Sequence, residues 1–259
     1  MIFEIASTSN SKYKYIKSLL QKKNRVKNGV FCAEGIKSVK DALASDFEIE
    51  CIAVSRSFYE SGGINENDGT IYVVEDNIFP ALCDTQTPQG ILSVIRMKQN
   101  ILPHENGRAY VYCDHISDPG NLGTIIRTAD AGALDGVILS PECADMYSPK
   151  TVRAAMGSVF HIPVYENVTA EQLSELKNAG YRILSADLSD NTIDYRTADY
   201  SGSVIVALGN EANGISGGIK EISDCFVKIP ILGRAESLNV SAAGAVLIYE
   251  MVRTRVRLV

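Results

Sequence analysis

The sequence predicts an α/β protein with two domains, and three observations support this fold class. The chain has 259 residues, which exceeds the usual size of one domain. Strand-like apolar runs alternate with helical segments along most of it, a pattern typical of a mainly parallel sheet covered by helices. The stretch 97–107, MKQNILPHENG, interrupts this alternation and is rich in Asn, Pro and Gly, which indicates a linker. We therefore expect domains at 1–96 and 108–259.

The composition excludes several classes of protein. With 46% hydrophobic and 22% charged residues, the chain is neither collagen-like, coiled-coil nor disordered. No apolar run approaches the length of a membrane span, and the first residues carry Glu4 and lack a basic leader region, so we expect a cytoplasmic protein without membrane contact. The six cysteines show no zinc spacing, and only three histidines occur. We therefore expect no metal site.

The first domain begins with a basic amphipathic helix. Ser9 or Asn10 is placed to cap a helix that starts near residue 11, and Tyr13, Ile16 and Leu20 share one face at helical spacing. Next, the apolar runs and intervening turns predict strands at 29–35, 48–55, 69–76 and 90–97, with a helix at 36–45.

Positive charge is concentrated in this domain. The whole chain carries 25 basic and 31 acidic residues, a net charge of −6. Residues 1–40 contain nine Lys or Arg against two Glu, a local charge of +7, and the remainder carries −13. Such a patch is typical of a nucleic-acid contact surface, although a solvated helix face is the alternative. We assign the contact to Lys12, Lys22, Lys23 and Arg25.

The second domain alternates strands and helices. Strands are predicted at 109–114, 136–140, 161–165, 181–187, 203–210 and 225–231, and helices at 121–133, 149–158, 169–180 and 241–255. Three of these strands lead into loops with unusual sequences, at 114–123, 209–216 and 230–241. Ligands of open parallel sheets bind at the carboxyl ends of the strands, so we expect the functional site at these loops.

The first of these loops carries Asn121 after a Pro-Gly turn, and Arg127 follows about one and a half helical turns later. Both side chains are expected near one cleft, although Asn121 also suits a purely structural helix cap. Guanidinium groups are rarely buried without a partner, and a phosphate is a natural one for Arg127.

The second loop places Glu211 between Gly209 and Gly214. Glycines permit positive φ and close approach of the backbone to a ligand, but an ordinary strand-to-helix turn has the same composition. In the third loop, Asn239 or Ser241 is placed to cap the last helix. The patterns GxGxxG, GxxxxGK[ST] and HExxH are absent from the sequence, which argues against dinucleotide enzymes, P-loop enzymes and zinc proteases.

Taken together, DPGNLGTIIRTADAG, ALGNEANGIS and KIPILGRAESLNVSAAGAVLIYEM closely resemble the three motifs of the SpoU family of RNA 2'-O-ribose methyltransferases. The first domain resembles the family's RNA-substrate domain, a small ribosomal-protein-like α/β fold, so the resemblance covers essentially the whole chain. It implies an S-adenosylmethionine-dependent enzyme whose SPOUT catalytic domain, at 108–259, has a parallel sheet and a C-terminal trefoil knot. It also implies a homodimer through the catalytic domain, with the helix at 241–255 at or near the interface.

Motif positions carry the family's functional residues onto this sequence. The resemblance implies a catalytic set of Asn121, Arg127, Glu211, Ser237 and Asn239, and a cofactor-binding set of Leu208, Gly209, Asn210, Ile229, Leu238 and Asn239. Because guanidinium stays protonated, we favour Arg127 as the group that orients the target phosphate. Asn121 would then bind the ribose or the arginine, and Glu211 would orient Arg127 or the substrate, with the proton acceptor left unassigned.

The resemblance leaves the substrate open. The two-domain layout favours ribosomal RNA, and transfer RNA is the alternative. Two further alternatives are a non-catalytic RNA-binding or assembly protein that keeps the fold, and a SPOUT methyltransferase that acts on a base. The first predicts a damaged motif residue, and none is visible. The Asn, Arg, Glu and Ser-Asn set weighs against the second.

Overall fold

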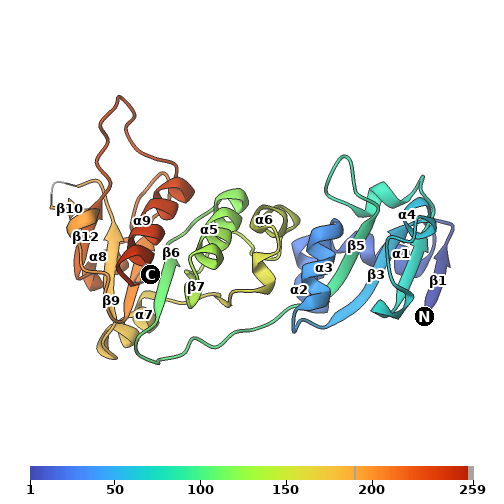
Figure 1. Cartoon of the computed structure of the whole chain (residues 1–259), viewed down its shortest axis with the longest axis horizontal. Helices are drawn as coiled ribbons and strands as arrows, with labels where there is room; N and C mark the ends of the chain where they lie inside the picture. Colours follow the sequence, from blue (N-terminus) through green and yellow to red (C-terminus); the bar gives the residue numbers. More distant parts are fainter. Residues whose placement is uncertain (190, 256–259) are drawn as a thin grey trace. The chain divides into compact units, whose positions relative to one another are not determined.

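The computed structural model describes residues 1–189 and 191–255, and these form two compact units. The first unit comprises Met1–Lys98 and Asp145–Phe160, and the second comprises Gln99–Ala144 and the residues from His161 onward (Figure 1). The sequence assigned the segment Asp145–Phe160 to the second domain. In the structure, Tyr147 and Phe160 of this segment contact the ring of Phe31, with centroids 4.4 and 6.1 Å away. Residues 256–259 of the predicted second domain lie outside the described part of the chain.

The first unit contains a five-stranded mixed sheet in the order β1-β4-β3-β5-β2. Strands β1, β4 and β3 run parallel, whereas β5 is antiparallel to both of its neighbours. The four predicted strands are confirmed, but β1 was missed because it is a short edge strand with three exposed residues. The bounds are Ile2–Ile5 for β1, Val30–Glu34 for β2, Ile49–Ser55 for β3, Ile71–Val74 for β4 and Ile91–Arg96 for β5.

Helices cover both faces of this sheet. The predicted first helix is confirmed, and Asn10 caps it by accepting from the backbone N–H groups of Lys12 and Tyr13. Tyr13 and Ile16 are buried, but Leu20 lies beyond the helix end and is only half-buried. The bounds are Ser11–Ser18 for α1, Lys22–Asn28 for α2, Ile36–Ala44 for α3, Arg56–Glu60 for α4 and Pro149–Ala155 for α6, with short 3-10 turns at Glu66–Asp68, Phe79–Leu82 and Ser158–Phe160.

Arg25 in α2 is buried, and its prediction as an RNA contact is wrong. Its side chain is 3% exposed. The guanidinium lies 2.5 Å from Asp145 and donates to the carbonyl oxygens of Leu19 and Leu20. A buried guanidinium needs such partners because desolvation of an unpaired charge is costly. Lys22 and Lys23 of the same helix are exposed.

The second unit contains a seven-stranded sheet in the order β10-β12-β9-β11-β6-β7-β8, in which every neighbouring pair is parallel. The predicted parallel sheet is therefore confirmed, and the two-residue strand β10 is an addition to it. The bounds are Ala109–Cys113 for β6, Gly136–Leu139 for β7, Val164–Tyr165 for β8, Arg182–Ala186 for β9, Ile193–Asp194 for β10, Val204–Leu208 for β11 and Cys225–Lys228 for β12.

Helices again cover both faces. Leu173, Leu176 and Ile219 of α7 and α8 pack with β6, β9 and β11 in one apolar cluster, whereas α5 and α9 pack together on the opposite face (Figure 1). The bounds are Pro119–Ala131 for α5, Ala170–Asn178 for α7, Gly217–Ile222 for α8 and Val240–Arg255 for α9, with a 3-10 turn at Tyr195–Thr197.

This arrangement opens a crevice at the carboxyl ends of two neighbouring strands. The chain leaves β6 toward α5 on one face and leaves β11 toward α8 on the other. Such divergence is where open α/β sheets bind ligands. Strand order does not test the trefoil knot, which stays a prediction. Within residues 1–189 and 191–255, no helix is long and apolar enough to cross a membrane.

Candidate active site

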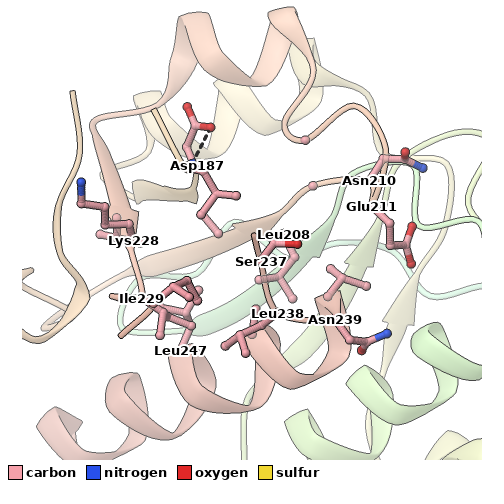
Figure 2. Close-up of a pocket in the computed structure, with 18 of the residues that line it drawn as sticks. Asp187, Leu208, Asn210, Glu211, Lys228, Ile229, Ser237, Leu238, Asn239 and Leu247 are labelled. Carbon is pink, nitrogen blue, oxygen red and sulfur yellow. Dashed lines mark hydrogen bonds between the residues drawn. The ribbon is translucent and has the colours of Figure 1, made fainter. Parts of the chain in front are cut away.

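A cavity of about 500 Å³ lies at the carboxyl ends of β9, β11 and β12, closed on one side by the start of α9 (Figure 2). Its walls contain both the predicted cofactor residues and part of the predicted catalytic set. The predicted residues that line it are Leu208, Gly209, Asn210, Glu211, Ile229, Ser237, Leu238 and Asn239. Two of the predicted loops, 209–216 and 230–241, therefore meet at one cavity.

The part of the wall that follows β9 was not predicted from the sequence. Ala186, Asp187 and Leu188 line the cavity there, and Lys228 at the end of β12 lines it as well. The signal for Asp187 was available, because the predicted strand 181–187 ends on a carboxylate, just as the predicted strand 203–210 leads to Glu211. Asp187 accepts hydrogen bonds from the Leu188 N–H and the Ser189 hydroxyl.

The loop after β11 is a tight backbone turn. Asn210 and Gly214 exchange two backbone hydrogen bonds of 3.0 and 2.8 Å, and Gly214 has φ +67°. This pairing folds the chain back over Gly209, where an added Cβ would lie 2.3 Å from the Gly214 carbonyl carbon and 2.4 Å from the Ile215 nitrogen. Gly209 is therefore required by the turn itself, and it also lines the cavity.

Asn210 also anchors this loop to the end of β6. Its side-chain oxygen accepts from the Ala212 N–H at 2.9 Å, and its amide donates to the carbonyl of His115 at 2.8 Å. The buried carboxylate of Asp114 adds a second connection, since it contacts the His115 ring at 2.8 Å and accepts from the Ser216 N–H at 2.6 Å. These contacts hold the first two loops in a fixed arrangement.

Three polar side chains from three loops are linked at the rim of the cavity. Asn121 donates to the Glu211 carboxylate at 2.6 Å, and Asn239 donates to the Asn121 side-chain oxygen at 3.0 Å. Asp118, and not Asn121, caps α5, so Asn121 is not the helix cap that its sequence position also suited. Asn239 has two roles, because its oxygen also caps α9 by accepting from the Ser241 N–H at 2.9 Å.

Arg127 lies apart from this cavity. It does not line the wall, and six residues after Asn121 correspond to about 9 Å along the helix and about 240° around it. Its side chain is exposed, and among the described residues it has no hydrogen-bond or ion-pair partner. Arg127 and Asn121, which were expected near one cleft, therefore do not meet at this cavity, and the charge of Arg127 is free to meet an external anion.

The charges and donors of the cavity suit an organic ligand. Leu208, Ile229, Leu238 and Leu247 supply apolar surface, and the charged lining residues in the described part of the chain are Asp187, Glu211 and Lys228. Across residues 1–189 and 191–255, no group of three or more His, Cys, Asp or Glu side chains is placed to hold a metal ion.

Two family models match the chain. The SpoU rRNA Methylase family matches residues 108–249, and the MRM3-like substrate binding domain matches residues 10–93. The first match spans more than half of the chain and contains the cavity and its polar rim.

Individual proteins resemble the chain over nearly its full length. The 23S rRNA (guanosine(2553)-2'-O)-methyltransferase RlmP of Bacillus subtilis (strain 168) is 37% identical over 96% of this chain and 98% of its own. The crystal structure of AdoMet-bound rRNA methyltransferase from Sinorhizobium meliloti has a TM-score of 0.87 at 34% identity, covering 97% and 98% of the two chains. The SpoU methyltransferase AviRb from Streptomyces viridochromogenes, solved with AdoMet, shares the fold with a TM-score of 0.84 at 24% identity over 95% and 98%.

Proposed function

The chain belongs to the SpoU rRNA methylase family, and from this premise we propose that it methylates a ribose 2'-hydroxyl of ribosomal RNA with S-adenosylmethionine. The observation that carries the proposal is the cavity at the ends of β9, β11 and β12 with Asn121, Glu211 and Asn239 hydrogen-bonded at its rim. The names of the Bacillus and Sinorhizobium relatives, an rRNA 2'-O-methyltransferase and an AdoMet-bound rRNA methyltransferase, support the same reaction.

The residues of the cavity fit S-adenosylmethionine. Its volume of about 500 Å³ is in the range of pockets for organic ligands. Leu208, Ile229 and Leu238 offer apolar walls for a purine ring, and the Asp187 carboxylate is an acceptor for ribose hydroxyls. Glu211 adds negative charge, which is complementary to a sulfonium cation. When bound, S-adenosylmethionine supplies the electrophilic methyl group.

The polar rim would hold the ribose oxygen for an in-line displacement. Its carboxylate and amide groups are already hydrogen-bonded to one another, so they need little rearrangement to bind a hydroxyl. Asn121 is the central member, because it contacts both Glu211 and Asn239. Asn239 is fixed further by its role as the cap of α9.

Arg127 would bind a phosphate of the RNA. The side chain is exposed and remains a cation at all physiological pH values. A guanidinium pairs well with phosphate oxygens through paired N–H donors. This role places Arg127 on the substrate rather than on the cofactor.

The proposal assigns one role to each part of the chain. Residues 1–96 would select the RNA, which the substrate-domain match at 10–93 supports. Residues 97–107 would link the two domains, and residues 108–259 would catalyse the methyl transfer. A ribosomal RNA substrate implies a cytoplasmic enzyme. A homodimer would use the outer face of α9, where Tyr249 is 52% exposed, and sedimentation at micromolar concentration would report a dimer mass, whereas a monomer would contradict this part.

Calorimetry and single-turnover kinetics on the full-length protein test the proposal. The wild-type protein should bind S-adenosylmethionine and transfer label to unmodified 23S rRNA. Asn121→Ala should keep most of the cofactor affinity and lower the turnover rate at least about 100-fold, because its contacts act chiefly in the transition state. Asn178→Ala, at the exposed end of α7, is the matched control and should behave as wild type. Absence of cofactor binding by the wild-type chain would contradict the proposal.

A further inference from the structure

A groove in the first unit has no part in the site described above. Its volume is about 580 Å³, and its residues come from α1, the end of α2 and the strands β3, β4 and β5. We call it the α1 groove, and it is lined by Ser11, Lys12, Tyr15, Asn28, Glu50, Tyr72 and Arg96. All of these residues lie in the first compact unit.

Aromatic rings lie along this groove. Tyr72 of β4 stacks with Phe3 of β1, with ring centroids 5.4 Å apart and planes inclined by 24°. Phe3 is 45% exposed, although it is a large apolar side chain on an edge strand. The ammonium group of Lys12 lies 4.5 Å from the centroid of the Tyr15 ring and 5.4 Å from that of Tyr72. The groove therefore combines a cation with the ring of Tyr72, and the exposed ring of Phe3, which does not itself line the groove, continues this aromatic surface.

Polar groups of the groove form one network around Glu50. Its carboxylate contacts the Lys12 ammonium at 2.8 Å, the Tyr15 hydroxyl at 3.0 Å and the Arg96 guanidinium at 3.7 Å. Burial lowers the pKa of Lys12, but the hydrogen bond and charge of Glu50 outweigh it, so the pKa is raised overall. Burial likewise opposes ionisation of Glu50, yet the Lys12 contact leaves the pKa of Glu50 lowered. Both groups are thus charged at neutral pH.

The helices that carry the groove also carry unpaired positive charge. The side chains concerned are exposed, and within the described part of the chain none has a carboxylate partner. They are Lys14 and Lys17 of α1 and Lys22, Lys23 and Lys27 of α2. An anionic polymer lying on these two helices would be attracted by all of them, since exposed cations release counterions when they meet phosphates.

We propose that the α1 groove binds an unpaired nucleotide of the RNA substrate, with its base stacked on the Tyr72–Phe3 pair and its neighbouring phosphates on the lysines of α1 and α2. Bases in a duplex are already stacked, so only an unpaired base can present its face to these rings. Glu50 retains acceptor capacity for N–H groups of a base edge. The inference rests on the proposed function and adds to it the place and the strand state of the RNA contact.

Fluorescence titration of the full-length protein tests this inference. The probe is a single-stranded 12-nucleotide oligouridylate with a central 2-aminopurine, whose emission is quenched when it stacks and whose uridine neighbours stack only weakly, and the chain contains no tryptophan to interfere. Wild-type protein should quench the probe and prefer it to a 12-base-pair RNA duplex. Phe3→Ala and Tyr72→Leu should each weaken binding about 5- to 150-fold, the range for loss of one base–aromatic stack.

Controls separate stacking from folding and from charge. Tyr72→Phe keeps the ring and should bind as wild type. Leu43→Ala removes a similarly exposed apolar side chain from α3 and should have no effect. Because Tyr72 is half-buried, thermal melts accompany each variant, and Phe3→Ala carries the test if Tyr72→Leu melts early.

Unchanged binding by folded Phe3→Ala, or equal binding of the duplex, would overturn the inference. These outcomes are distinct from failure of the proposed function, because wild-type methyl transfer to 23S rRNA is measured separately. If the wild-type protein methylates rRNA but Phe3→Ala keeps full affinity for the oligonucleotide, only the inference about the groove is refuted. A protein that binds the oligonucleotide but does not bind S-adenosylmethionine refutes the proposed function alone.

Discussion

Replacing Gly209 with alanine tests how the cofactor cavity is built. The turn after β11 folds Gly214 back over Gly209, so an added Cβ would lie 2.3 Å from a carbonyl carbon, 2.4 Å from a backbone nitrogen and 2.6 Å from a carbonyl oxygen. All three atoms belong to the main chain and cannot rotate away. The turn must therefore either hold under strain or open, and the paired hydrogen bonds between Asn210 and Gly214 would break if it opened.

The magnitude follows from these two outcomes. Overpacking a well-packed site costs about 1–3 kcal/mol, and contact with main chain favours the upper end, about 3 kcal/mol. If the turn holds, the strain lowers the free energy of unfolding by that amount, which is about 6–12 °C in Tm at about 2–4 °C per kcal/mol. If the turn opens, Asn210 leaves the cavity wall and the same energy appears as a loss of up to about 150-fold in cofactor affinity.

A thermal melt detects the loss of stability if the turn holds, and calorimetric titration with S-adenosylmethionine detects the loss of affinity if it opens. Gly217→Ala is the matched control, because no atom lies within 4 Å of its added Cβ at the start of α8. This control should keep its affinity and should lose no stability, since alanine is favoured over glycine in a helix. A folded Gly209→Ala protein with wild-type affinity and wild-type Tm would refute the reasoning.

Three further changes have distinct expected results. Arg127→Ala should keep cofactor affinity in calorimetry and lower rRNA turnover at least about 100-fold, and joint loss of affinity and stability would show a structural role instead. Arg25→Met should reduce the free energy of unfolding by about 3–5 kcal/mol, because it leaves the carboxylate of Asp145 without its buried partner; a wild-type urea midpoint would contradict this. Charge reversal at Lys22 and Lys23 should weaken RNA binding and flatten its salt slope by about 1.4, at about 0.7 per phosphate contact, whereas an unchanged slope would remove both from the RNA surface.

Regular elements of the fold were predictable because their signals are local. Buried strands such as β6 and β11 are short apolar runs followed by turn residues, and α9 begins at a polar cap. Strands β1 and β10 escaped prediction because edge strands of two to four residues have little apolar pattern. Their place in the sheets is determined by neighbours that are distant in the sequence.

The surroundings of individual side chains could not be predicted, because they depend on contacts between residues that are distant in the sequence. Arg25 lies among exposed lysines in the sequence, yet it is buried because Asp145, 120 residues away, pairs with it. Arg127 was expected near the same cleft as Asn121, but the helical phase turns it outward, away from the cavity. In both cases the sequence identified the positive charge, but it did not predict which residues surround the side chain.

The candidate site was predictable where motif and strand end coincide. Glu211 and Asn239 were placed by both signals, and the structure links them through Asn121. Asp187 lacked a motif and was missed, although it follows a strand directly. The requirement for glycine at position 209 was recognised, but its cause lies in the return of Gly214, which appears only in three dimensions.

The most direct test of the central claim is the chemical position of the methyl group. Purified full-length protein, methyl-labelled S-adenosylmethionine and unmodified 23S rRNA are incubated together, and the labelled RNA is digested with ribonuclease T2. A 2'-O-methyl group removes the hydroxyl that this cleavage needs, so the account predicts label in a single nuclease-resistant dinucleotide. Label in a mononucleotide would show methylation of a base, and an absence of label would show that the chain does not methylate this RNA; either result would contradict the account.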